Sequence, residues 1–167
     1  TTNLIATGAS MRNIPNTNII AIGKHVPKWV QLGIDEYTKR LPSKRIRWYT
    51  GDIKSAKNMG EKEIIKYENE LLISKVPSNS VTIALDKKGH SMNNEQLCDL
   101  LQSCHSNTSV SFLIGGSLGL SQSTLDYSDH ILSLSNLILP HAMVRLILLE
   151  QLYRSWSILN HHPYHRE

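Results

Sequence analysis

Short runs of apolar residues alternate along this chain with longer segments in which apolar residues recur every three or four positions. The runs have the length of buried strands, and the longer segments have the spacing of amphipathic helices. The five runs are residues 19–22, 46–50, 81–85, 110–114 and 130–134. Strands that alternate with helices predict an α/β fold, a three-layer α/β/α domain around a mostly parallel sheet of five to six strands.

Local signals mark where several of these elements end. The third strand is expected to stop at Leu85, because residues 86–89 read Asp-Lys-Lys-Gly, which is typical of a turn. Asn93 or Asn94 is placed to cap the helix that follows, and Ser121 to cap a short helix after the fourth strand. The last helical pattern runs for about five turns and leads into a basic, aromatic tail.

The length of 167 residues fits one ordinary domain. Residues 1–17 are polar and include Gly8 and Pro15, so we expect a flexible or artificially added segment there and a single domain over residues 18–167. No apolar stretch reaches the roughly 18 residues of a membrane span, and the first residues lack a signal-peptide pattern. These features favour a cytoplasmic protein that does not bind a membrane.

Metal and redox chemistry are not expected. The eight histidines show no HExxH spacing, and Cys98 and Cys104 fit neither a CxxC motif nor a disulfide framework. We expect both cysteines to be small core residues in a reducing compartment. The net charge of +4 permits nucleic-acid binding but is common in other proteins.

Two loops at strand ends predict a ligand pocket. Residues 115–119 read Gly-Gly-Ser-Leu-Gly with neither Rossmann nor Walker spacing, so a plain tight turn is the simpler reading of that motif alone. Residues 135–140 carry a Leu-Ile-Leu run, which would either fill a core or line a pocket. Together with Leu85, the two loops favour a pocket suited to an adenosyl group, because ligands bind α/β sheets at the carboxyl ends of strands.

The last helix and the tail hold the other candidate residues. His141 would cap the helix, bind an anion or act as an acid or base, although a structural histidine is the simpler reading. Glu150 and Arg154 are four residues apart, the spacing of a solvated surface ion pair. Residues 164–166, Tyr-His-Arg, would ordinarily fray, but an aromatic ring with cations is also what single-stranded RNA recognition requires.

The carboxy-terminal motifs resemble those of a known family. They are Leu132-Ser133-Leu134-Ser135, Leu139-Pro140-His141, Arg145, Glu150-Gln151-Leu152-Tyr153-Arg154 and residues 160–167. Upstream, Leu113-Ile114-Gly115-Gly116 and Ile20-Ala21-Ile22-Gly23 extend the match over residues 18–167. The chain thereby resembles the SPOUT methyltransferases that methylate N3 of a pseudouridine in 23S ribosomal RNA.

This resemblance implies a carboxy-terminal trefoil knot, an obligate homodimer and S-adenosylmethionine as the cofactor. The resemblance implies that eight residues contact the cofactor: Leu85, Gly116, Ser135, Asn136, Leu137, Ile138, Leu139 and Pro140. It also implies four catalytic residues that face the cofactor of the other subunit: Arg154, Tyr164, His165 and Arg166. The substrate would be 23S ribosomal RNA in the assembled ribosome or large subunit, because a net charge of +4 without a separate RNA-binding module offers little to recognise naked RNA.

The reaction implied is methyl transfer from a sulfonium to an imide nitrogen that must lose its proton. Either His165 or His141 takes the proton, or water takes it while Arg154 and Arg166 stabilise the anion. We favour the cations, with Tyr164 stacking on the target base. The rival functions are a SPOUT methyltransferase for another RNA nucleotide and a non-catalytic ribosome-associated RNA-binding protein.

Overall fold

One sheet of five parallel strands organises the molecule. The computed structural model describes residues 12–42, 44–54, 56–104 and 107–166. The strand order is β2-β1-β4-β3-β5, and every neighbouring pair is parallel. The strands are β1 (Thr17–Ile22), β2 (Ile46–Gly51), β3 (Ser80–Ser91), β4 (Ser109–Ile114) and β5 (His130–Ser133). The predicted α/β sheet is therefore confirmed.

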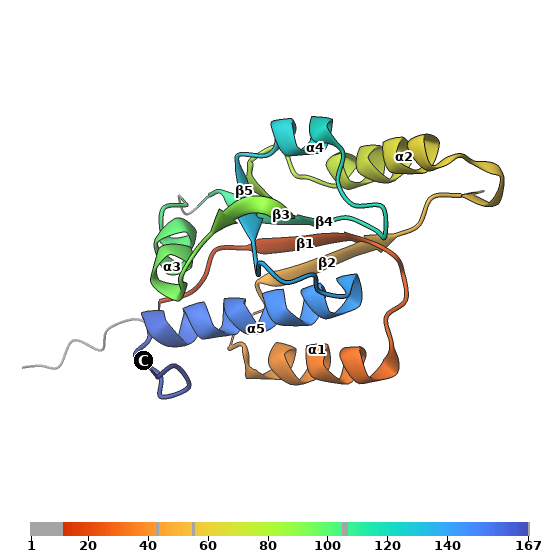
Figure 1. Cartoon of the computed structure of the whole chain (residues 1–167). Coiled ribbons are helices and arrows are strands. Elements are labelled where there is room, and N and C mark those ends of the chain that lie inside the picture. The colour runs from red at the N-terminus through yellow and green to blue at the C-terminus, as the bar shows by residue number, and fades with distance from the viewer. Residues whose placement is uncertain (1–11, 43, 55, 105–106, 167) are drawn as a thin grey trace, which may run out of the picture.

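Helices cover both faces of this sheet. Figure 1 shows α1, α3 and α5 on one face and α2 and α4 on the other, which makes the three layers that were predicted. The helices are α1 (Lys28–Arg40), α2 (Glu61–Ser74), α3 (Asn94–Gln102), α4 (Gln122–Tyr127) and α5 (His141–Leu159), with a short 3-10 turn at Ala56–Asn58. In the described part of the chain, none of the helices is long and apolar enough to cross a membrane.

The predicted helix caps are present. The Asn93 side chain accepts a hydrogen bond from the Gln96 amide at 2.8 Å, and the Gln96 side chain accepts one from the Asn93 amide at 2.9 Å. This reciprocal pair satisfies two backbone donors that the start of α3 would otherwise leave without partners. Ser121 caps α4 by accepting a hydrogen bond from the Thr124 amide at 3.3 Å.

The third strand is longer than the sequence predicted. Leu85 pairs with Leu132 of β5, but the strand resumes pairing with β5 at His90 after a shift of register. The Asp86 side chain accepts a hydrogen bond from the Lys88 amide at 2.8 Å, so the turn chemistry is present inside the strand. Only tertiary structure could reveal the continuation, because it depends on the partner strand that β5 supplies.

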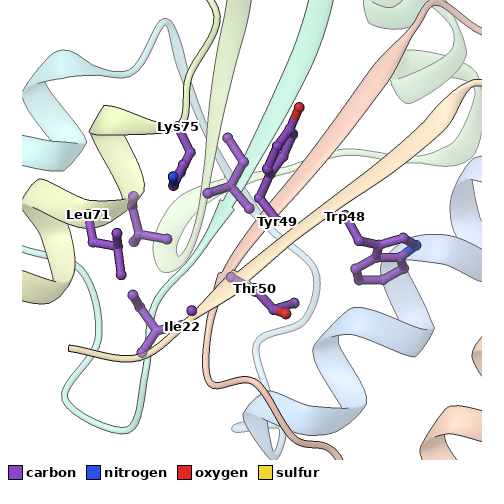
Figure 2. Close-up of a pocket in the computed structure, with 10 residues that line it drawn as sticks. Ile22, Trp48, Tyr49, Thr50, Leu71 and Lys75 are labelled. Atoms are coloured by element: carbon purple, nitrogen blue, oxygen red, sulfur yellow. The ribbon is translucent and has the colours of Figure 1, made fainter. Parts of the chain in front are cut away.

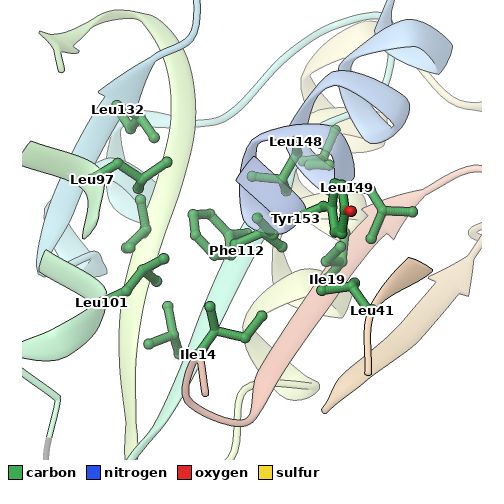
Figure 3. Packing of buried hydrophobic residues seen from close by; sticks show 14 of the residues in the cluster. Ile14, Ile19, Leu41, Leu97, Leu101, Phe112, Leu132, Leu148, Leu149 and Tyr153 are labelled. Carbon is green, nitrogen blue, oxygen red and sulfur yellow. The ribbon is translucent and has the colours of Figure 1, made fainter. Parts of the chain in front are cut away.

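The larger core lies between the sheet and α1, α3 and α5. Figure 3 shows Phe112 of β4 packed among Leu148 and Leu149 of α5 and Leu97 of α3. A smaller cluster on the opposite face contains Ile20 and Ile22. All six residues of β1 are buried, as expected of a strand covered on both faces.

Ordered structure begins before residue 18, where the domain was expected to start. Ile14 is 1% exposed and belongs to the larger core, and the carbonyl of Asn16 accepts a hydrogen bond from the Val110 amide at 2.8 Å. The expected flexible segment falls mostly on residues 1–11, which lie outside the described residues.

Candidate active site

A cavity of about 320 Å³ lies between the irregular middle of β3, the loops after β4 and β5, and the first turn of α5. Six of the eight residues predicted to contact the cofactor line it, namely Leu85, Gly116, Ser135, Leu137, Ile138 and Leu139. Asn136 and Pro140 are not among the lining residues. The other wall includes Leu132 and Val144. A pocket is therefore present at the loops after β4 and β5, as predicted, although Leu85 lies inside β3 and not at its end. Glycines, serines and aliphatic residues make up most of its lining, together with Asp86 and Lys87.

The glycine loop after β4 is both a tight turn and part of this wall. Gly119 has φ +79°, in the left-handed region that favours glycine, and its amide donates to the Gly116 carbonyl at 3.0 Å. A side chain at Gly115 would lie 2.8 Å from the backbone of Gly119. The two interpretations of this motif are thus compatible, because the turn itself brings backbone to the cavity.

Serine hydroxyls order the loop after β5. The Ser133 hydroxyl donates to the Ser135 carbonyl at 3.0 Å, and the Ser135 hydroxyl accepts from the Leu137 amide at 2.9 Å. Leu137 and Ile138 are 76% and 86% exposed, so in a single chain neither residue fills the core. Exposed bulky aliphatic side chains at the rim of a cavity are candidates for contact with a ligand or another subunit.

A second cluster forms around Glu150 near the other end of α5. One carboxylate oxygen, Oε1, accepts from Arg154 Nη2 at 2.6 Å, from Arg154 Nε at 3.1 Å and from the Tyr164 hydroxyl at 2.9 Å. Arg154 Nη1 lies 3.2 Å from His165 Nδ1. The tertiary structure therefore brings together three of the four predicted catalytic residues, while Arg166 is exposed.

Tyr164 is held by several partners in this cluster. Its ring centroid lies 4.6 Å from that of Tyr153 and 4.9 Å from the Arg154 guanidinium. Its hydroxyl donates to Glu150 Oε1 at 2.9 Å and lies 3.0 Å from the hydroxyl of Tyr37. Burial, followed by the hydrogen bonds to Tyr37 and Glu150, raises the pKa of Tyr164 far above its usual range. The phenol therefore stays neutral and cannot serve as a base.

Arg154 remains a cation in this environment. Burial by itself would lower the pKa of Arg154, but the hydrogen bond and the charge of Glu150 outweigh burial and raise it. The side chains of Arg154 and Glu150 are 26% and 17% exposed, so the pair is better shielded than the solvated surface pair expected from the sequence. The i,i+4 spacing in the sequence predicted the contact between Glu150 and Arg154. The contact between Glu150 and Tyr164 could not be predicted from the sequence.

The cavity and the Glu150 cluster are well separated within one chain. Val144 lines the cavity, and Arg154 lies ten residues later on α5, which corresponds to roughly 15 Å along the helix axis. Figure 1 shows the C-terminal tail folding back at the far end of α5. His141 is the first residue of α5, near the cavity, and it is exposed.

Among the described residues, no group of three or more His, Cys, Asp or Glu side chains is arranged to hold a metal ion.

Comparison with known proteins supplies the family. A family model described as predicted SPOUT methyltransferase matches residues 16–165, nearly the whole chain. The chain belongs to the SPOUT methyltransferase family.

Curated relatives of this SPOUT methyltransferase carry one name, ribosomal RNA large subunit methyltransferase H. The relative from Finegoldia magna is 42% identical over 160 residues, which cover 90% of this chain and 99% of the relative. The relative from Coxiella burnetii is 40% identical over 156 residues, which cover 89% of this chain and 98% of the relative.

A solved structure supports the same fold at low sequence identity. It is described as a probable methylase family protein from Haemophilus influenzae Rd KW20. The similarity has a TM-score of 0.53 at 13% identity and covers 92% of this SPOUT methyltransferase and 71% of the other chain. At that identity the similarity concerns the fold alone.

Proposed function

We propose that this chain transfers a methyl group from S-adenosylmethionine to N3 of a pseudouridine in 23S ribosomal RNA. The observation that carries the proposal is a cavity beside β3 and the ends of β4 and β5 in a chain from a methyltransferase family. The names of the relatives supply the large ribosomal subunit RNA as substrate, at about 40% identity over nearly their whole length. The resemblance noted in the sequence supplies the pseudouridine.

The residues around the cavity fit an adenosyl cofactor. Its volume of about 320 Å³ falls within the usual range of small-molecule sites. Leu85, Leu137, Ile138 and Leu139 provide aliphatic walls, and the Gly116 turn and Ser135 provide backbone polar groups. Asn136 and Pro140 belong to the same loop as Ser135 and Leu137 and are proposed as further cofactor contacts. When bound, S-adenosylmethionine supplies an activated methyl group.

Two subunits build each active site in this proposal. Within one chain the Glu150 cluster lies roughly 15 Å along α5 from the cavity. This distance is too long for Arg154 to reach a reacting nitrogen there. A symmetric dimer would bring the tail of one subunit to the cavity of its partner. Exposed apolar residues would supply its contacts, among them Trp29 and Leu32 of α1, at 57% and 63% exposed. A carboxy-terminal trefoil knot belongs to the same proposal.

The Glu150 cluster and Arg166 would position the substrate base and stabilise the charge that develops on it. Arg154 stabilises the anion that forms when the imide loses its proton, and Arg166 adds a second cation. His165 and His141 are the candidate proton acceptors, with water as the third. Stacking of Tyr164 on the base stays a prediction, and it would require the ring to leave its contacts with Tyr153 and Arg154.

The proposed substrate is the assembled ribosome or large subunit, which places the enzyme in the cytoplasm. The test is to incubate the protein and radiolabelled S-adenosylmethionine with ribosomes from a strain that lacks the activity, and then to identify the labelled nucleoside. Label in 3-methylpseudouridine is expected from ribosomes, with little from protein-free ribosomal RNA. Label in another nucleoside would identify a different RNA substrate, and failure to bind the cofactor would favour a non-catalytic RNA-binding protein.

Arg154→Ala tests the assigned role of the cation. Its single-turnover methyl transfer should be slower than that of the wild type, because the developing anion loses a charged partner. An unchanged single-turnover rate would contradict that role.

A further inference from the structure

A second cavity of about 260 Å³ lies beside the ends of β1 and β2, and none of its lining residues belongs to the proposed cofactor site. The lining residues include Lys24, Gln31, Trp48, Thr50 and Arg145. Figure 2 shows Trp48 projecting from β2 toward α5, away from Tyr49, which is the next residue on the same strand. This cavity thus lies on the α1 and α5 face of the sheet.

Arg145 is a buried cation in the wall of this cavity. It is 3% exposed, and its Nη2 donates to the carbonyls of Ile22 and Gly23 at 2.6 and 2.7 Å. Its Nε has no hydrogen-bond partner among the described residues. Burial lowers the pKa of Arg145, and the charge of Asp52 opposes that shift. Among the described residues no carboxylate lies within 4 Å of this guanidinium; Asp52, which acts on it from farther away, accepts a hydrogen bond from the Lys24 amide at 3.2 Å. A buried guanidinium with an unused donor and no directly paired carboxylate is complementary to an anion.

The helix ends beside Arg145 add to this positive potential. Neither α1 nor α5 has a side-chain cap at its N-terminus, and neither has an acidic residue in its first turn. Figure 1 shows both helices beginning at the same edge of the molecule. They pack closely, since a side chain at Gly33 of α1 would lie 2.8 Å from Leu146 of α5. Two helix N-termini thus direct the positive ends of their dipoles to one edge.

We propose that this cavity binds a phosphate group of the substrate RNA backbone, close to the target nucleotide. The Arg145 guanidinium, the Lys24 ammonium and the first amides of α1 would supply the positive charge and the donors. Val144 lines the cofactor cavity while Arg145 lines this one, so a phosphate here would lie next to the proposed methyl-transfer site. The inference rests on the proposed function for the identity of the RNA, but the binding of phosphate can be tested without it.

The first experiment uses inorganic phosphate as the probe and NMR of the ¹⁵N-labelled protein as the readout. Saturable shifts are expected at the Arg145 Nε–H and at the amides of Lys28 and Trp29. Lys24→Gln leaves the Arg145 hydrogen bonds to the end of β1 intact and should weaken phosphate binding about fivefold. Lys62→Gln, an exposed lysine of α2 on the other face, is the matched control and should bind as the wild type does. No shift at Arg145 Nε, or equal affinity in Lys24→Gln, would overturn the proposal.

The second experiment distinguishes RNA phosphate from free phosphate. In single-turnover methylation of ribosomes, Lys24→Gln should raise the half-saturating ribosome concentration several-fold and make it less salt-dependent, with unchanged affinity for S-adenosylmethionine. Phosphate binding together with wild-type ribosome dependence in Lys24→Gln would overturn the assignment to RNA. If the wild type itself methylates no ribosomes, the proposed function is wrong. The NMR titration still decides in that case whether the cavity binds phosphate.

Discussion

At the scale of single residues, the Glu150 carboxylate contacts the C-terminal tail in addition to Arg154, the one partner that the sequence predicted. One oxygen accepts two hydrogen bonds from Arg154 and one from Tyr164, so it joins α5 to the C-terminal tail. Its other oxygen accepts a hydrogen bond from Gln151 at 2.6 Å. Charge-assisted hydrogen bonds in a partly shielded site hold side chains in fixed positions. We therefore regard Glu150 as a positioning residue for Arg154 and Tyr164.

Glu150→Gln is expected to lower kcat by about 10- to 100-fold, because Arg154 and the tail lose their fixed orientation. Affinity for S-adenosylmethionine, measured by calorimetry, should not change, since Glu150 lies outside the cofactor cavity. Glu36→Gln is the matched control: Glu36 and Arg40 form an i,i+4 pair with side chains 53% and 40% exposed. Equal activity of the two variants would show that the Glu150 pair is an ordinary surface ion pair.

Tyr164 should make the stability of the protein sensitive to alkaline pH. The fold raises its pKa by burial and by the hydrogen bonds to Tyr37 and Glu150, so the folded state favours the neutral phenol. The unfolded chain releases this proton near pH 10, and the stabilisation is therefore complete below about pH 10 and declines as the pH rises above it. Denaturant unfolding at pH 9 to 11 should show a smaller decline for Tyr164→Phe than for the wild type. Tyr127→Phe, at a tyrosine 47% exposed on α4, should decline as the wild type does.

At the scale of elements, the long β3 strand depends on close backbone contact with β5. After the turn at residues 86–89, the chain rejoins β5 at His90. Gly89 lies directly against the neighbouring strand, and a side chain there would lie 2.6 Å from the Ile131 carbonyl carbon and oxygen. Real Cβ atoms do not approach a backbone so closely, so one of the two strands would have to move.

Gly89→Ala is expected to lower the free energy of unfolding by about 1–3 kcal/mol, because the new methyl group meets backbone that cannot move aside. Gly60→Ala is the control, since a side chain at Gly60 has no atom within 4 Å. Because Gly60 is the N-cap of α2, where alanine is less favourable than glycine, its effect should be small but destabilising, below about 1 kcal/mol. Urea unfolding followed by circular dichroism measures both values, and a Gly89→Ala protein as stable as Gly60→Ala would contradict the close approach.

At the scale of the whole molecule, the distance between the two proposed parts of the active site is the reason for proposing a dimer. The proposed cofactor cavity lies at the start of α5, and the Glu150 cluster lies near its end. A rigid helix separates them, so no side-chain rearrangement joins them within a chain. The exposed Leu137 and Ile138 at the rim of the cavity are where a partner could complete the site.

Mixing two defective variants tests whether each site is shared. Arg154→Ala damages the tail, and Leu139→Glu damages the cavity. If the tail of one subunit serves the cavity of the other, each mixed dimer contains one intact site, and a one-to-one co-expressed mixture should recover about a quarter of wild-type activity. If each subunit builds its own site, the mixture should be as inactive as either variant alone. Sedimentation of the mixture confirms that dimers have formed.

Much of this architecture followed from the sequence because its causes are local. Runs of apolar residues predicted all five strands, and Asn93 and Ser121 predicted two helix caps, since a cap needs only a side chain and the amide two or three residues later. The loops after β4 and β5 predicted the cavity, because parallel strands bring their carboxyl ends to one edge. The family followed from motifs spread along nearly the whole chain.

Tertiary structure alone decided the features that depend on partners distant in sequence. The continuation of β3 needs β5 beside it, and the contact between Glu150 and Tyr164 needs the tail to fold back on α5. The burial of Arg145 against the end of β1 joins residues more than 120 positions apart. Spacing along the chain carries no record of such contacts, because they form only when packing of the core has fixed where each helix lies on the sheet.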